Sequence, residues 1–166
     1  MLKETLHNKR MIYQFQLFVL QCFEEQFSSA RFKKHIILER SPMDSLHIFA
    51  TESYNSGDLS KEEFEDIKTR TVALYEKYHI PTYTDCVITK IDSCKHGIQE
   101  VFQIVKRESD ECYRKRRSIL VWLYCSDPLI QKSNIENRGR PEEKNYDINY
   151  MLRINQEYER LLETYV

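Results

Sequence analysis

The feature that most constrains this chain is one apolar run, SILVWLY, at residues 118–124. It is far too short to span a bilayer, and its β-branched and aromatic side chains favour a strand. A strand without polar alternation is typical of a sheet covered on both faces, and such sheets are usually parallel. The run therefore predicts a buried parallel strand and an α/β fold.

Two shorter β-rich runs predict further strands, at residues 35–38 and 86–91. Apolar residues at helical spacing and N-capping patterns predict helices around them. The expected helices are 11–27, one from Pro42 to near Gly57, 60–79, 98–105, one from Asp127 and one from Asp147. The order of strand then helix, three times over, predicts a parallel sheet with right-handed crossovers.

The charge balance excludes some classes of partner. The formal net charge is -1 and the pI is near 6.5, so no overall basic field attracts nucleic acid or an anionic membrane. Residues 106–117, KRESDECYRKRR, mix both signs of charge. We expect this segment to be a solvated connection rather than a nucleic-acid patch.

The five cysteines form no CxxC pair, and their number is odd. This pattern favours free thiols in a reducing compartment over a disulfide framework. The five histidines are scattered, so no zinc-type cluster is expected. The first residues, MLKETLHNKR, lack the apolar stretch of a signal peptide.

Glu39, Arg40 and Ser41 follow the predicted strand at residues 35–38. Open α/β sheets bind ligands beyond the carboxyl ends of their strands. A carboxylate and a guanidinium there suit a metal-bound phosphate and a reacting hydroxyl. A surface ion pair beside a helix cap explains the same residues, and the tripeptide alone leaves both interpretations open.

Gln16 interrupts the apolar stripe of the first predicted helix. An unpaired buried amide costs about 1–3 kcal/mol, so this side chain needs a partner. The edge of a nucleobase would satisfy it, and so would water at the helix edge. Phe49, in the helix after Ser41, is either a ring that stacks on the same base or an ordinary core residue.

Residues 137–144 read NRGRPEEK, with opposed charges around one of only three glycines. Arg138 and Arg140 match the geometry of phosphate oxygens, and Gly139 permits a tight path between them. Glu142 and Glu143 would keep the arginines solvated or accept from a sugar hydroxyl. A self-paired connection between two helices is the alternative.

Together these motifs resemble the deoxyribonucleoside kinase family. The matching stretches are FQLFVLQ (15–21), ILERSPMDSLHIF (37–49), SGDLSKEEFEDIKTRTVALY (56–75) and residues 120–162. ERS followed by RGRPEE at this spacing is the most specific part. The resemblance implies a partial P-loop-kinase-like three-layer fold, with a short parallel sheet flanked by helices, in a single domain over residues 1–166.

The resemblance also implies an activity, the transfer of the ATP γ-phosphate to the 5′-hydroxyl of a deoxynucleoside with Mg²⁺, in nucleotide salvage. Gln16 would hydrogen-bond the base, Phe49 would pack on it, and Glu143 would accept from the 3′-hydroxyl. The residues expected near the phosphate are Glu39 at magnesium, Arg40 beside the 5′-hydroxyl, and the lid arginines Arg138 and Arg140.

The chain departs from the family pattern in its phosphate-binding part. Gly57, Gly97 and Gly139 are followed by Asp, Ile and Arg, so residues 1–166 contain no GxxxxGKS/T loop. We therefore expect a chain that is N-terminally truncated relative to the family. Two candidate strands stand where the family has one, so we interpret residues 86–117 as an insertion whose strand fills a gap in the sheet.

Several functions stay open at this point. One is an active kinase, whose phosphate loop is supplied elsewhere or is encoded upstream of Met1. The others are a catalytically inactive remnant that binds a nucleoside or a partner protein, and an α/β interaction module. A thymidylate-kinase-like nucleotide kinase is a further alternative, which RGRPEE disfavours.

The resemblance implies a homodimer through helices, with Phe64, Tyr75 and Tyr78 as contacts. The charge balance and the short apolar runs indicate neither nucleic acid nor membrane as a partner. It implies a cytoplasmic location, in the host cytoplasm for a viral chain, and a mitochondrial one stays open.

Overall fold

The computed structural model describes residues 11–31, 36–115, 117–141 and 147–165. The chain divides into two compact units. Unit 1 comprises Met1–Ile80 and Arg153–Leu162, and unit 2 comprises Pro81–Leu152 and Glu163–Val166.

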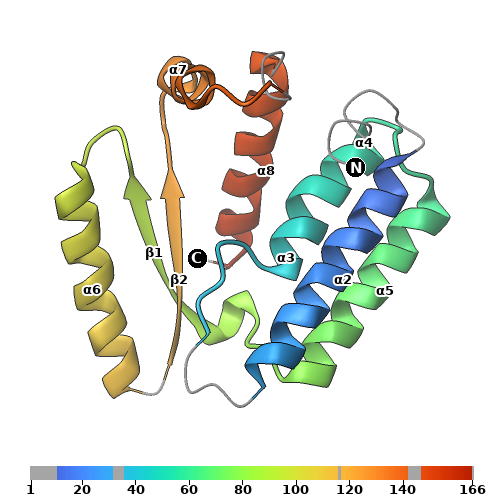
Figure 1. The fold of residues 1–166 in the computed structure, drawn as a ribbon, viewed down its shortest axis with the longest axis horizontal. Helices are drawn as coiled ribbons and strands as arrows, with labels where there is room; N and C mark the ends of the chain where they lie inside the picture. Colours follow the sequence, from blue (N-terminus) through green and yellow to red (C-terminus); the bar gives the residue numbers. More distant parts are fainter. Residues whose placement is uncertain (1–10, 32–35, 116, 142–146, 166) are drawn as a thin grey trace. The chain divides into compact units, whose positions relative to one another are not determined.

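Unit 1 is helical in its described residues (Figure 1). Its elements are α2 (Ile12–Ala30), α3 (Pro42–Asp44), η2 (Ser45–Ala50), α4 (Thr51–Asn55), α5 (Lys61–Tyr78) and part of α8 (Ile148–Tyr165). The predicted helix starts at Ser41 and Ser60 are confirmed, since each heads a reciprocal capping box. These boxes satisfy backbone N–H groups that the first turn of a helix leaves open.

The helix that follows Ser41 is not α-helical throughout. Residues Ser45–Ala50 form a π-helix, η2, between α3 and α4. Thr51 bonds back to this stretch, and its Oγ1 donates to the Leu46 carbonyl at 3.0 Å. Such π-helical turns are rare and occur often at functional sites. The apolar spacing alone predicts a plain helix here, so this departure is a finding of the structure.

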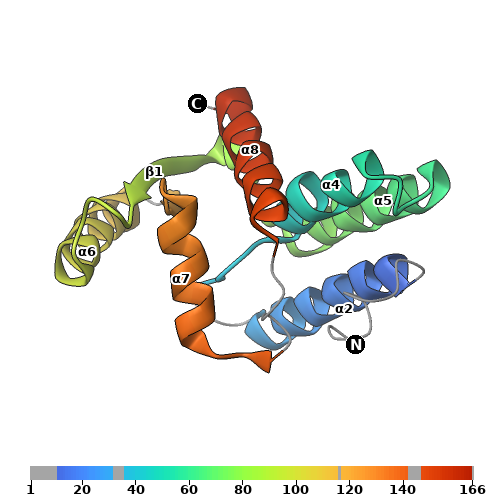
Figure 2. The same cartoon turned by 90° about the horizontal axis from the view of Figure 1, so that it is seen from above.

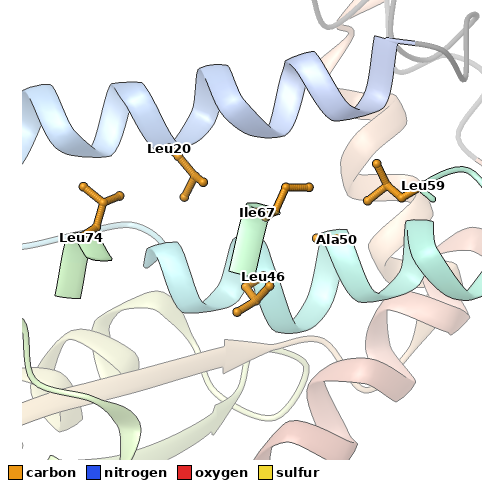
Figure 3. Close-up of a cluster of buried hydrophobic side chains, with 6 residues drawn as sticks. All are labelled: Leu20, Leu46, Ala50, Leu59, Ile67 and Leu74. Carbon is orange, nitrogen blue, oxygen red and sulfur yellow. The ribbon is translucent and has the colours of Figure 1, made fainter. Parts of the chain in front are cut away.

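Six buried apolar side chains form the core of unit 1 (Figure 3). They come from α2, η2, α5 and the segment before α5: Leu20, Leu46, Ala50, Leu59, Ile67 and Leu74. Thr71 is also fully buried, and its hydroxyl donates to the Ile67 carbonyl at 2.9 Å. The core therefore holds α2, η2 and α5 together.

The residues expected at a dimer contact pack inside unit 1. Tyr75 is buried, and the Tyr78 ring lies 5.6 Å from that of Phe27. The Phe64 ring stacks on Tyr54 at 4.9 Å. The prediction that Tyr75 offers a surface to a second copy is wrong, because its side chain is buried.

Unit 2 contains two parallel strands, β1 (Cys86–Asp92) and β2 (Ser118–Tyr124). Cys86 lies opposite Ser118 in the register, and Asp92 lies opposite Tyr124. Helix α6 (Ile98–Arg114) connects the strands and runs alongside them (Figure 1), and Figure 2 shows it next to β1. The short η3 (Tyr83–Asp85) precedes β1, and α7 (Pro128–Arg138) follows β2. The predicted fold class, a short parallel sheet flanked by helices, is confirmed.

The predicted strand at residues 35–38 is wrong in its described part. Residues 36–38 have no strand structure, and Ile37 is 95% exposed. A strand needs a neighbour for its backbone groups, and among the described residues only β1 and β2 pair. The hypothesis that the 86–91 strand fills a gap between two others is therefore also wrong, because β1 is an edge strand.

The charge run at residues 106–117 is not a solvated connection. Its first nine residues continue α6 to Arg114, and Cys112 within them is buried. Lys115 just beyond pairs with Glu111 at 2.6 Å, one helical turn away. Lys, Arg and Glu are good helix formers, and such pairs add support, so a charged segment with a buried cysteine stays helical. No described helix is long and apolar enough to cross a membrane.

Candidate functional site

Gln16 is 5% exposed in α2, so the interpretation as a helix-edge side chain that reaches water is wrong. Its Oε1 accepts a hydrogen bond from Ser45 Oγ at 2.9 Å, so the amide is fixed against η2. Within the described residues Nε2 makes no hydrogen bond. Sequence reasoning missed Ser45, although a serine in the apolar stretch after Pro42 is the kind of partner that a buried glutamine requires.

Arg40 and Phe49 are brought together on the two sides of the Ser41 cap. The Arg40 Cζ atom lies 4.9 Å from the centroid of the Phe49 ring, within the range of a cation–π contact. Arg40 is exposed, and Phe49 is half-buried in η2. One face of the ring is therefore covered by a guanidinium.

The turn that carries Arg40 is held by Asp44. The carboxylate oxygen Oδ2 accepts from the backbone N–H of Ser41 at 2.6 Å and from its Oγ at 2.8 Å. Near this turn, burial and the charge of Asp44 raise the pKa of Tyr158 in α8 to about 12, while Arg40 opposes the rise. The Tyr158 hydroxyl therefore stays protonated at neutral pH. No sequence signal singled out this tyrosine among the apolar residues of its helix.

A buried carboxylate ties α8 to α4 inside unit 1. Glu52 Oε1 accepts from Arg153 Nε at 2.8 Å and from Ser56 Oγ at 2.9 Å. A buried charge is tolerated only with such partners. The two residues of the ion pair are 101 positions apart, so local sequence patterns contain no signal for the contact.

Glu39 is exposed beside Arg40. Among the described residues, no three His, Cys, Asp or Glu side chains gather to hold a metal ion. Mg²⁺, however, is often held by one or two carboxylates together with substrate phosphates and water. The exposed Glu39 carboxylate suits this kind of site, in which one protein carboxylate and a substrate phosphate share the magnesium ion.

Arg138 is the last residue of α7, and Gly139 follows it with a φ of 68°, in the left-handed region. The Gly139 N–H bonds the Glu136 carbonyl at 3.0 Å and closes the helix. Arg138 and Arg140 are exposed residues of unit 2. Glu143 lies outside the described residues. The convergence of these three groups on Arg40 stays a prediction.

A comparison with protein families identifies one match. Residues 2–116 match the family model described as deoxynucleoside kinase, which is well over half of the chain. The matched range contains Gln16, Glu39, Arg40 and Phe49, runs through the segment that we interpret as an insertion, and ends before Arg138. No curated protein and no solved structure matches the chain. Because the family model matches more than half of the chain, the chain belongs to the deoxynucleoside kinase family.

Proposed function

We propose that this chain is a phosphotransferase that moves the γ-phosphate of ATP to the 5′-hydroxyl of a deoxynucleoside, in nucleotide salvage. Family membership supports a deoxynucleoside kinase-like function in general. The observation that carries the nucleoside part is the hydrogen bond from Ser45 Oγ to Gln16 Oε1. It holds a buried amide in one orientation, as recognition of a planar base requires.

The base would be read from two sides. Gln16 Nε2 would donate to an acceptor on the edge of the base, because Oε1 is already engaged by Ser45. Phe49 would stack on the base with the ring face that Arg40 leaves uncovered, or Arg40 would move off the ring when the substrate arrives.

The phosphate side of the proposal rests on charged residues. Arg40 would sit near the 5′-hydroxyl, with Glu39 at a magnesium ion. Arg138 and Arg140 would neutralise the transferring phosphoryl group, and Glu143 would accept from the 3′-hydroxyl. Phosphoryl transfer depends mainly on positioning and charge stabilisation, which arginines provide.

The residues of this chain do not fit a glycine-rich phosphate cradle, because none of its three glycines precedes a lysine. The proposed roles of Arg40, Arg138 and Arg140 concern the sugar and the transferred phosphoryl group, and none of them holds the rest of ATP. The same observation favours a second candidate function, a nucleoside-binding protein without catalysis. The single-domain organisation, the insertion at 86–117, a homodimer and a cytoplasmic location stay predictions.

A phosphorylation assay separates the two candidates. The full chain is incubated with labelled ATP, magnesium and each of the four deoxynucleosides. Deoxynucleoside monophosphate that disappears in Gln16→Ala but persists in Gln21→Ala supports the kinase, since Gln21 is exposed on the same helix. If no monophosphate forms above the blank, the proposal that this chain is a kinase is wrong.

Ligand binding then tests the second candidate. A ligand that binds the folded state alone raises the temperature of unfolding. Thymidine or deoxycytidine would raise that temperature in the wild-type chain and in Gln21→Ala, but not in Gln16→Ala. An unchanged wild-type melting curve with every deoxynucleoside would remove the nucleoside-binding function as well.

A further inference from the structure

Two cysteines meet at the carboxyl ends of the paired strands in unit 2. Cys94 lies in the loop after β1, and Cys125 follows β2 directly. Their Sγ atoms are 3.1 Å apart, although 31 positions separate them in the sequence. Both residues are half-buried rather than enclosed in a core.

Hydrogen bonds to one carboxylate hold the two loops together. Asp92 Oδ1 accepts from the Cys94 N–H at 3.0 Å and from the Ser126 N–H at 3.2 Å. Asp92 is only 4% exposed, and Lys95 Nζ lies 3.3 Å from its other oxygen. Burial would raise the pKa of Asp92, but the hydrogen bonds from Ser126 and Cys94 outweigh it and hold that pKa well below its usual range.

A second set of bonds joins the same loops. The N–H of Ser93 donates to the Tyr124 carbonyl at 2.7 Å, and its Oγ donates to the same oxygen at 2.9 Å. The two sulfurs are therefore held near each other by their surroundings. A disulfide bond is about 2 Å long, so bond formation requires an approach of only about 1 Å.

The remaining cysteines lack this arrangement. All five are free thiols, and Cys22, Cys86 and Cys112 make no sulfur–sulfur hydrogen bond within the described residues. Cys112 is buried, which limits its access to reagents. The pair at the strand ends is thus set apart by its geometry.

We propose that Cys94 and Cys125 form a reversible modification site for low-molecular-weight disulfides of the glutathione class. The proposal is independent of any nucleoside or phosphate chemistry. Its chemical partner is a small disulfide in one direction and the corresponding thiol in the other.

The exchange balances in two steps. The Cys94 thiolate, its proton released to water, attacks one sulfur of the small disulfide, forms a mixed disulfide and expels one small thiolate, which takes up a proton. The Cys125 sulfur then loses its proton and attacks Cys94 Sγ, forming the internal disulfide and expelling the second small thiol. The two protein thiols are oxidised, and the small disulfide is reduced to two thiols.

The order of the two steps follows from the environment of Cys125. Burial raises the pKa of that thiol, and its contact with Cys94 adds to the rise. A thiol with a raised pKa supplies less thiolate for the first attack. Cys125 Sγ also lies 3.2 Å from the carbonyl of Asp127, the residue that caps α7, so the internal disulfide would tie the start of α7 to the loop after β1.

Thiol trapping after redox equilibration tests the site. The full chain is equilibrated with mixtures of reduced and oxidised glutathione, quenched with an alkylating reagent and mapped by mass spectrometry without reduction. We expect a cross-linked peptide joining Cys94 to Cys125, the loss of two alkylated thiols, and full reversal by excess reduced glutathione. The oxidised chain should also unfold several degrees higher, because a cross-link restricts the unfolded state.

Single variants identify the chemistry. Cys125→Ser should stop at one glutathionyl group on Cys94, while Cys22→Ser should form the internal disulfide as the wild type does. The proposal is overturned if both Cys94 and Cys125 stay fully alkylated at every glutathione ratio, or if the cross-link joins Cys86 to Cys112 instead. The wild-type measurement needs no substitution, so a variant that misfolds does not obscure the result.

Discussion

Unit 1 and unit 2 bury their apolar side chains to different extents. In unit 1 the helices α2, η2 and α5 share one packed core, with Ile67 fully buried at its centre. In unit 2 the β2 strand contains no buried residue, and on α6 Ile98 is 80% and Phe102 74% exposed. A two-stranded sheet has two edges and little interior, so the stability of unit 2 depends more on polar contacts at its loops.

This difference also separates the candidate sites. The residues around the buried amide of Gln16 are supported by a dense core, which favours precise positioning of a ligand. The Asp92 loops and the thiol pair belong to the unit with the thinner core. Four experiments test the contrast, from the largest expected effect to the smallest.

The largest effect is expected from Ile67→Ala. Removing a fully buried isoleucine leaves a cavity, and such changes cost about 2–5 kcal/mol of unfolding free energy. The matched control is Ile98→Ala in α6, for which we expect a change within about 0.5 kcal/mol because the side chain is exposed. Urea unfolding of both variants measures the difference, and equal losses would remove the contrast between the two units.

Ser45→Ala should have the next largest effect. It leaves Gln16 Oε1 buried without its donor, which costs about 1–3 kcal/mol. Adding Gln16→Leu should recover part of the loss, because replacing both polar partners by apolar groups is often nearly neutral. The control is Ser29→Ala, whose hydroxyl makes an exposed bond within α2. Additive losses in the double variant would show that the two side chains do not interact.

Asp92→Asn tests the polar anchor of unit 2 through its pH dependence. The folded-state pKa of Asp92 lies below the ordinary value of 3.8. Its contribution to stability is therefore present above pH 3.8 and is lost as the pH falls further toward the folded-state pKa. The melting temperature of the wild type should fall more steeply in acid than that of Asp92→Asn. Asp110 is exposed, so Asp110→Asn should lose melting temperature in acid as the wild type does. The prediction is contradicted if the melting temperature of Asp92→Asn falls in acid as steeply as that of the wild type.

The smallest effect is expected at His47 in η2. Burial lowers the pKa of this imidazole below 6.5, opposed by the charge of Asp44. As the pH falls, His47 therefore takes up its proton in the unfolded chain at a higher pH than in the folded chain. The free energy of unfolding is thus unaffected by this group above pH 6.5 and decreases as the solution becomes more acidic. In His47→Gln the melting temperature should therefore fall slightly less between pH 7 and pH 5 than it does in the wild type. His79→Asn, at an exposed histidine, serves as the control and should leave the slope unchanged.

Local chemistry explains which parts of the fold were predictable. The capping boxes at Ser41 and Ser60 and the Asp127 cap follow from side chains close in sequence. The apolar run SILVWLY predicted a strand with a parallel neighbour, which is confirmed, but the expected burial of that strand is wrong, because no residue of β2 is buried. The predicted strand at 35–38 failed because strand formation depends on a neighbour elsewhere in the chain. Residues 106–114 were predicted to be a solvated connection because they are highly charged, but Lys, Arg and Glu are also good helix formers, and these residues continue α6.

The candidate site was predictable to a similar extent. A buried polar residue in an apolar stripe identified Gln16, but its partner Ser45 depends on how α2 packs against η2. The Arg40 contact with Phe49 needs the turn that Asp44 holds. The Glu52–Arg153 ion pair and the environment of Tyr158 join segments about a hundred positions apart, which no local pattern encodes.

The central claim is that unit 1 carries a deoxynucleoside site organised by Gln16. Calorimetric titration of the full chain with thymidine and with deoxycytidine tests it most directly. We expect saturable heat with at least one nucleoside, lost in Gln16→Ala and retained in Gln21→Ala. Heat of binding that is the same in Gln16→Ala as in the wild type, or no heat with any deoxynucleoside, would contradict it.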